Sequence, residues 1–202
     1  MVRIDTPQLD KLEISLFHQF VPDTSQLALF INRLPKLKAH NEAHVYFYES
    51  GVHLKLGRFF DKGLGISYQV VDWPVLSVAQ VCTSSFFRAF SATVEYLYIH
   101  DEYDSSWRDT QVGSNHWLEL LRPFTSVKSL YLSHVIVRCI TPTLWELVGE
   151  RVVGVLPAMQ TLFLKDLDLL GSASVPEAIR SFVSGRQFFG RPVAVSHWRR
   201  KY

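Results

Sequence analysis

The chain has few of the residues that would commit it to a special chemistry or environment. It contains only two cysteines, Cys82 and Cys139, among 202 residues. Two cysteines set beside apolar residues cannot build a disulfide framework, and they favour reduced, buried thiols in an intracellular protein, cytoplasmic or nuclear. Net charge is only +2, so no overall field draws the chain toward nucleic acid or a membrane. No apolar run approaches the roughly 18 residues of a membrane span.

The start of the chain lacks a secretory signal, because residues 2–7 form no apolar stretch after Met1. The first recognisable element, residues 9–17, already has the pattern of a strand. We therefore expect a chain that begins inside a larger architecture, as a fragment would. The apolar fraction of 48% can fill one core, and we expect a single domain over residues 1–202.

Motifs for catalysis or metal binding are also lacking. No G-x-S-x-G elbow occurs, and the glycines at 63 and 65 lack the third glycine and the helix of a phosphate-binding loop. In His40-Asn-Glu-Ala-His44 the glutamate holds the wrong position for a zinc-protease helix. This segment leads into a strand, where residues four apart lie about 13 Å apart. We expect no enzyme activity, no catalytic residue, no metal and no cofactor.

What the chain does contain is a repeat. Three segments, residues 94–99, 127–132 and 159–164, share the pattern Φ-x-x-Φ-x-Φ, in which Φ is apolar. Their anchor leucines, Leu97, Leu130 and Leu162, are separated by steps of 33 and 32 residues. The pattern continues at residues 193–195, a further 31 residues along, and it recurs upstream at residues 9–14 and in part at 34–39. Alternation at the end of each unit predicts a short strand.

Helix signals precede these strands. Thr141 followed by Pro142 predicts a helix over residues 143–153, and Ser174 with Glu177 forms a capping box that opens a helix to about 188, ended by Gly190. Further helices are expected at residues 26–33, 75–81 and 116–121. Helix and strand in alternation predict an α/β fold with a parallel sheet. Because the strands alternate apolar and polar residues, we expect helices on one face only, in an irregular leucine-rich-repeat-like solenoid.

The repeat is interrupted between Leu37 and Leu97. Residues 44–48 and 52–56, separated by Glu49-Ser-Gly51, predict a β-hairpin, and residues 66–71 predict a third strand. We interpret residues 44–71 as an inserted antiparallel β-meander. The acidic segment from 101 to 115 is expected to be a solvated loop at the rim.

The side chains that point away from the helices form the candidate binding face. Tyr98, Tyr131 and Phe163 are expected to stack as a ladder on adjacent parallel strands, because such strands lie about 4.8 Å apart. The same register gives the outward positions Glu13, Lys38 and Ala194, and Glu95 and Lys165 are expected to flank the ladder. An exposed aromatic stripe is a good anchor for a protein partner, although it can equally serve to shield the sheet. Three tryptophans are expected to pack in the core or at its rim: Trp73, Trp117 and Trp145.

Several segments together resemble the leucine-rich-repeat region of the F-box-like proteins of mushroom-forming fungi. These segments are Asp5-Thr-Pro-Gln-Leu-Asp-Lys-Leu-Glu-Ile, Phe30-Ile-Asn-Arg-Leu-Pro-Lys-Leu-Lys-Ala, residues 73–82, Trp117-Leu-Glu-Leu-Leu-Arg-Pro-Phe, Leu147-Val-Gly-Glu-Arg-Val and Leu156-Pro-Ala-Met-Gln-Thr-Leu-Phe-Leu. The resemblance implies a repeat domain that recognises substrates of a ubiquitin ligase through protein–protein contacts. It also implies an F-box bundle that docks the ligase adaptor. We expect that bundle to be missing here, because no F-box segment precedes Leu9.

Two alternatives stand beside the interaction module. An α/β enzyme of hydrolase-like type would have helices on both faces of its sheet and polar residues converging beyond the strand ends. A truncated remnant without function would expose core at an uncapped solenoid end.

Overall fold

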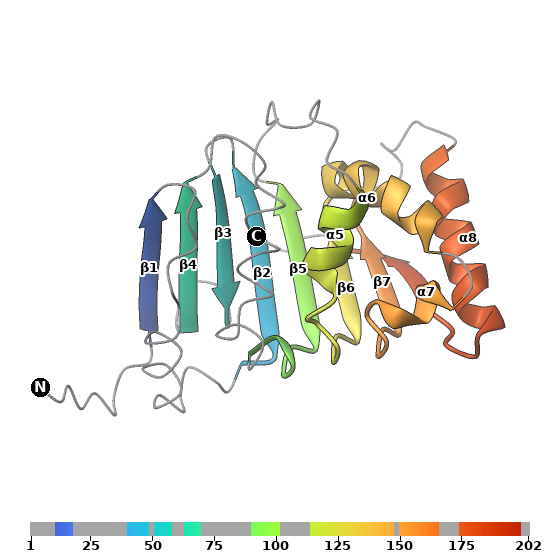
Figure 1. Cartoon of the computed structure of the whole chain (residues 1–202), viewed down its shortest axis with the longest axis horizontal. Coiled ribbons are helices and arrows are strands. Elements are labelled where there is room, and N and C mark those ends of the chain that lie inside the picture. Colours follow the sequence, from blue (N-terminus) through green and yellow to red (C-terminus); the bar gives the residue numbers. More distant parts are fainter. Residues whose placement is uncertain are drawn as a thin grey trace, which may run out of the picture.

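The computed structural model of the chain describes residues 11–17, 40–48, 51–57, 63–69, 90–101, 114–147, 150–165 and 174–198. Its eight strands form one open, mostly parallel sheet in the order β1-β4-β3-β2-β5-β6-β7-β8 (Figure 1). The strands are β1 Lys11–Phe17, β2 Glu42–Tyr48, β3 Gly51–Leu56, β4 Gly63–Gln69, β5 Tyr96–Asp101, β6 Ser129–Leu132, β7 Thr161–Leu164 and β8 Ala194–His197. The described helices are α5 Ser114–Leu121, α6 His134–Glu146, α7 Arg151–Gly154 and α8 Ser174–Phe188. The chain is therefore a mixed α/β protein.

The anchor leucines lie side by side as their spacing predicts. Leu97 of β5 is opposite Leu130 of β6, which is opposite Leu162 of β7, and both pairs of strands are parallel. The register at β8 differs from the expected one, because Leu162 lies opposite Val195 and not Val193. The third step is therefore 33 residues, and Val193 is the buried residue that leads into the strand.

A repeated backbone contact joins these units. The amide of Ser129 donates to the carbonyl of Glu95, and the amide of Thr161 donates to the carbonyl of Lys128, each at 3.0 Å. The equivalent amide of Ala194 donates to the carbonyl of Gln160 in the preceding unit, at 2.8 Å. In the same way the amide of Tyr96 donates at 3.0 Å to the carbonyl of Asn41, the residue that precedes β2. Strand β2 therefore occupies the place of a repeat beside β5, with which it pairs in parallel.

The interruption forms the antiparallel meander that the sequence predicts. Strand β2 pairs with β3, and β3 pairs with β4, both antiparallel. The third strand starts at Gly63, three residues before its expected start. At Gly63 φ is +119°, and a side-chain Cβ there would collide with the carbonyl of Leu56, so glycine is required where β4 begins beside β3. The meander lies between β5 and β1, and β1 pairs in parallel with β4.

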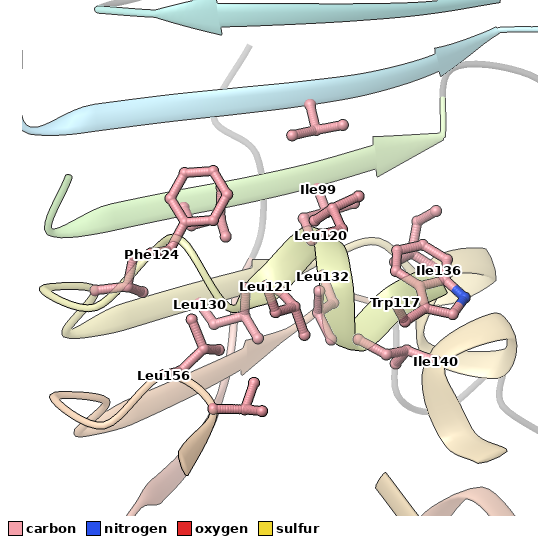
Figure 2. Packing of buried hydrophobic residues seen from close by; sticks show 14 of the residues in the cluster. Ile99, Trp117, Leu120, Leu121, Phe124, Leu130, Leu132, Ile136, Ile140 and Leu156 are labelled. Atoms are coloured by element: carbon pink, nitrogen blue, oxygen red, sulfur yellow. The ribbon is translucent and has the colours of Figure 1, made fainter. Parts of the chain in front are cut away.

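The described helices form a layer on the face that carries the anchor leucines. Helix α5 places Leu121 beside Leu130 and Leu132 of β6 and Leu120 beside Ile99 of β5 (Figure 2). Helix α6 packs beside α5, where Ile136 lies near Trp117. Trp117 is fully buried and meets Phe47 of β2 edge to face, with ring centroids 5.8 Å apart. Its predicted role in core packing is therefore confirmed. The layer covers the half of the sheet that contains β6, β7 and β8 (Figure 1).

Helix α6 differs from its prediction. It begins after Ser133, eight residues before Thr141, and Pro142 lies inside it and not at its first turn. Pro142 cannot donate a backbone hydrogen bond, and the hydroxyl of Thr141 turns back to the carbonyl of Val137 at 2.7 Å. The helix continues because burying its apolar face outweighs the missing bond. The region expected as one helix over 143–153 contains the end of α6 and the separate α7.

The prediction for α8 is confirmed over Ser174–Phe188. Gly190 adopts φ +69° just beyond the helix, its amide donates to the carbonyl of Gln187, and the amide of Arg191 donates to the carbonyl of Arg186. These two bonds are those of a Schellman motif, which satisfies carbonyls at the end of a helix. The predicted role of Gly190 as a helix stop is therefore confirmed.

Arg186 near the end of α8 is fully buried. Its guanidinium donates hydrogen bonds of 3.0–3.3 Å to five backbone carbonyls, those of Val152, Val155, Leu156, Met159 and Arg191. Burial lowers the pKa of this guanidinium. A single side chain thus fastens the segment between α7 and β7 to the last helix.

Several expectations lie outside the described residues. These are the helices at 26–33 and 75–81, the partial repeat with Lys38, the environments of Trp73 and Cys82, and the loop from 102 to 113. Within the described part of the chain, Cys139 is half-buried, and Trp145 is 42% exposed.

Candidate functional site

The face of the sheet opposite the helix layer is called the open face here. One row of residues in register crosses it from β1 to β8. In the strand order of the sheet this row consists of Glu13, Gly65, Lys55, His44, Tyr98, Tyr131, Phe163 and Ser196. The sequence predicts that three members of this row, Tyr98, Tyr131 and Phe163, lie on adjacent strands, and the structure brings these three together.

Four rings of this row form a continuous stack, which we call the aromatic ladder: His44, Tyr98, Tyr131 and Phe163. Ring centroids are 4.4 Å apart between His44 and Tyr98, and their planes differ by 8°. The distances are 4.2 Å from Tyr98 to Tyr131 and 4.3 Å from Tyr131 to Phe163. The ladder exists because in-register parallel strands bring equivalent side chains to the separation of stacked rings.

His44 is a rung that the repeat pattern does not reveal. The sequence predicts His44 in a hairpin and does not indicate which strand lies beside β5. In the structure β2 pairs with β5, and this pairing places His44 opposite Tyr98. The alternation His44, Tyr46, Tyr48 was the available signal for an aromatic face.

A second, shorter row lies next to the ladder. Tyr46 of β2 stacks on His100 of β5, with ring centroids 4.8 Å apart. Nδ1 of His44 and Nε2 of His100 lie 3.4 Å apart, at hydrogen-bond distance. His100 lies within β5 and is only 6% exposed. Its neighbours on the open face enclose the imidazole between aromatic rings.

Trp198, which sequence reasoning did not select, lies across the ladder. Its ring meets Tyr131, His100 and Tyr98 at steep angles, with centroid distances of 5.6, 5.8 and 6.2 Å. The indole N–H donates to the carbonyl of Leu132 at 3.4 Å. No periodicity in the sequence around Trp198 indicates its partners.

Accessibility differs along the open face. His44, Tyr46 and His100 are buried, whereas Tyr98, Tyr131 and Phe163 are each half-buried. The part of the ladder that a partner can reach is therefore the part carried by β5, β6 and β7. Burial among these rings raises the pKa of Tyr98, and a hydrogen bond with Tyr131 and the nearby Glu42 carboxylate add to this rise. The phenol therefore stays neutral well into the alkaline range.

The charged side chains that the sequence places beside the ladder have different positions in the structure. Glu95 and Lys128 precede β5 and β6 and form an ion pair at 2.6 Å, which raises the pKa of Lys128. Lys165 directly follows β7, two residues beyond Phe163, and is half-buried. Glu13 occupies the expected row, but three strands separate it from Tyr98, and it contacts Lys11 and His53 at 3.6 Å. Glu13 is therefore no part of the ladder's edge.

The expected outward residue of β8 also needs correction. Ala194 points to the open face, but it lies opposite Thr161, and Ser196 is the residue opposite Phe163. The two-residue shift in register at β8 moves Ala194 to the start of the strand, away from the ladder.

The described residues enclose a small apolar cavity beneath the helices. A cavity of about 10 Å³ lies between α5, α6, α8 and the sheet, and apolar side chains line it. Such a volume holds about one water molecule. Within the described ranges, no three side chains of histidine, cysteine, aspartate or glutamate converge to hold a metal ion. His40 and His44, four residues apart, lie just before and within β2.

Comparisons with protein-family models, with curated proteins and with solved structures find no match to this chain. None of the described helices combines the length and the apolar character that crossing a membrane requires.

Proposed function

We propose that the chain is a non-catalytic protein–protein interaction module that binds its partner on the open face. The observation that carries this proposal is the stack of Tyr98, Tyr131 and Phe163, half-buried on the face opposite the helices. Aromatic rings held rigidly on strands give a large contact area and lose little conformational entropy on binding. A row of them is typical of the centre of a binding surface.

The surroundings of the ladder agree with this role. Lys165, two residues beyond Phe163, and the Glu42 carboxylate, which acts on Tyr98, provide charged groups near a mostly apolar centre. Binding surfaces commonly combine an aromatic centre with a polar rim that fixes orientation more than it adds affinity.

We further propose that the domain is an irregular leucine-rich-repeat-type solenoid. Three features support this assignment: leucines in register on adjacent parallel strands, one layer of described helices, and the backbone bond repeated from unit to unit. Units of this type cannot bury their apolar side alone and gain stability by stacking. The antiparallel meander makes the solenoid irregular, and the short strands β6, β7 and β8 are its most regular part.

The experiment for the binding face compares capture of cellular proteins by four full-length variants. The triple change Tyr98→Ala, Tyr131→Ala, Phe163→Ala and the single change Phe163→Glu should each remove the proteins that the wild type captures. Trp145→Ala with Phe188→Ala alters exposed aromatics away from the ladder and should retain them. Leu130→Ala destabilises the covered face and should also retain them at a temperature where it is folded. Retention by the triple variant would overturn the proposal.

The nature of the partner is proposed from the sequence resemblance to F-box-like proteins. If the partner is a substrate of such a ligase, the chain fused behind an F-box segment should promote ubiquitination of the captured protein. The same fusion with Phe163→Glu should not promote it. Equal ubiquitination with both fusions would contradict substrate recognition through the ladder.

A further inference from the structure

Trp198 is an occupant of the open face that comes from outside the strands of the ladder. Its backbone amide donates to the carbonyl of Leu164 at 3.2 Å, so the chain passes the end of β7 at this point. The indole then extends over β6 and β5, where it meets Tyr131 and Tyr98 edge to face. The contact therefore joins the last described residue of the chain to the centre of the ladder.

The position that the indole occupies has a defined chemistry. Both faces of Tyr131 are covered by its stacked neighbours Tyr98 and Phe163, so the indole meets Tyr131 at its ring edge. Its plane is also steeply inclined to that of His100, and such T-shaped arrangements are favourable for aromatic pairs. The carbonyl of Leu132 accepts from the amide of Lys165 at 3.0 Å and from the indole N–H at 3.4 Å. A carbonyl has two lone pairs, so one remains for a donor in this position. Leucine and phenylalanine side chains have no such donor.

The segment that carries Trp198 is held only weakly on the sheet. Strand β8 has only four residues, and the exposed Ala194, Val195 and His197 make it the least buried strand described. The hydrogen bond to Leu132 is long at 3.4 Å, which indicates a weak bond. Elements with few buried contacts open at low free-energy cost. The indole can therefore leave its position without disturbing the helix-covered core.

We propose that Tyr98, Tyr131, His100 and the carbonyl of Leu132 form a recognition site for a tryptophan side chain of the partner protein. Trp198 is the intramolecular competitor for this site, and a partner binds by displacing it. This inference rests on the proposed function and deepens it, because it gives the chemistry of the partner's anchor residue. We refer to the four groups together as the indole site.

The test uses the full-length chain and N-acetyl-L-tryptophanamide as the probe. Binding is read from the backbone amide shifts of Tyr131 and Leu132 in heteronuclear NMR spectra. Trp198→Ala should bind the probe with a dissociation constant on the order of 1 mM, as befits a single aromatic group. The wild type should bind at least about tenfold more weakly, because Trp198 occupies the site most of the time. The phenylalanine analogue of the probe should bind Trp198→Ala more weakly, since it lacks the N–H donor.

Two control variants define where the probe binds. Trp198→Ala combined with Tyr131→Ala should lose the binding, and Trp145→Ala, which removes a tryptophan of α6, should bind no better than the wild type. Equal binding by wild type and Trp198→Ala would overturn the proposal, as would shift changes away from the ladder. A wild-type dimer that dissociates in Trp198→Ala would identify a second copy as the occupant and would also overturn it.

The probe experiment contains no partner protein, so its failure is distinct from failure of the proposed function. If the ladder variants lose the captured proteins but the probe does not bind the indole site, the proposed binding face is supported and the proposed tryptophan anchor is wrong. If the probe binds as expected while the ladder variants keep their captured proteins, the indole site stands and the proposed function is wrong.

Discussion

Tyr98 and Tyr131 lie one upon the other on neighbouring parallel strands, with ring centroids 4.2 Å apart and planes 14° apart. Their strand neighbours Leu97 and Leu130 are buried on the opposite face, beneath the helices. One register thus builds both surfaces of the sheet, an apolar core on one side and an aromatic row on the other. Because the two faces serve different purposes, changes on them are expected to have different costs.

Tyr131→Ala should lower the free energy of unfolding by about 1–2 kcal/mol, since the ring loses two stacked neighbours on a half-open surface. Leu130→Ala on the same strand should cost more, about 2–5 kcal/mol, because it empties a fully packed position. Urea denaturation of both variants measures the difference. A cost for Tyr131→Ala equal to or above that of Leu130→Ala would show that the open face is core.

Arg186→Met should lower the free energy of unfolding by roughly 3 kcal/mol or more, because it removes the guanidinium that donates four buried and one part-buried hydrogen bond to backbone carbonyls. Arg186→Lys should recover little of the loss, since an ammonium cannot reproduce the planar arrangement of donors. Arg180→Met, at an exposed position of the same helix, is the matched control. If Arg186→Met unfolds at the same urea concentration as Arg180→Met, the guanidinium does not fasten this segment.

Two glycines of the last helix region should respond to alanine with opposite signs. Gly190→Ala should destabilise the chain by about 1 kcal/mol, because alanine is strained at φ +69° although the space around it is open. Gly185→Ala should stabilise it by about 0.5–1 kcal/mol, because this position lies within α8 and the new methyl would meet Val152 at an ordinary contact distance of 3.6 Å. Thermal unfolding of the two variants measures these effects. Shifts of the two unfolding temperatures in the same direction would argue against the helix end described above.

The raised pKa of Tyr98 predicts a loss of stability at alkaline pH. The folded chain favours the neutral phenol, so its contribution is fully present below the ordinary value of 10.0 and is lost as pH rises beyond it. The stability of Tyr98→Phe should therefore fall less steeply than that of the wild type between about pH 9 and pH 11. Urea midpoints measured across this range make the comparison. Parallel curves for the two proteins would indicate that Tyr98 titrates normally.

The part of the fold that the sequence predicts is the part with a repeated signal. The spacing of Leu97, Leu130 and Leu162 predicts their adjacency and direction, and the alternation beside them predicts the stack of Tyr98, Tyr131 and Phe163. Alternating residues and a short turn likewise predict the meander. Such patterns work because strand geometry fixes which side chains share a face.

The remaining features depend on tertiary contacts that leave no local signal. Pro142 is favourable at a helix start, yet the apolar face of α6 carries the helix through it. His44 joins the ladder only because β2 pairs with β5, and Trp198 reaches it from β8 across two neighbouring strands. Strand pairing and long-range ring contacts depend on the packing of the whole sheet, so the spacing of residues in the sequence does not predict them.

The account depends most on the open face being the surface where a partner protein docks. Site-specific photo-cross-linking tests this directly, with p-benzoylphenylalanine placed at Phe163 on the ladder or at Phe188, which is 83% exposed on α8. The account predicts a cross-linked partner from position 163 and none from position 188. Cross-links from position 188 alone, or from neither position in cells where the wild type captures a partner, would contradict it.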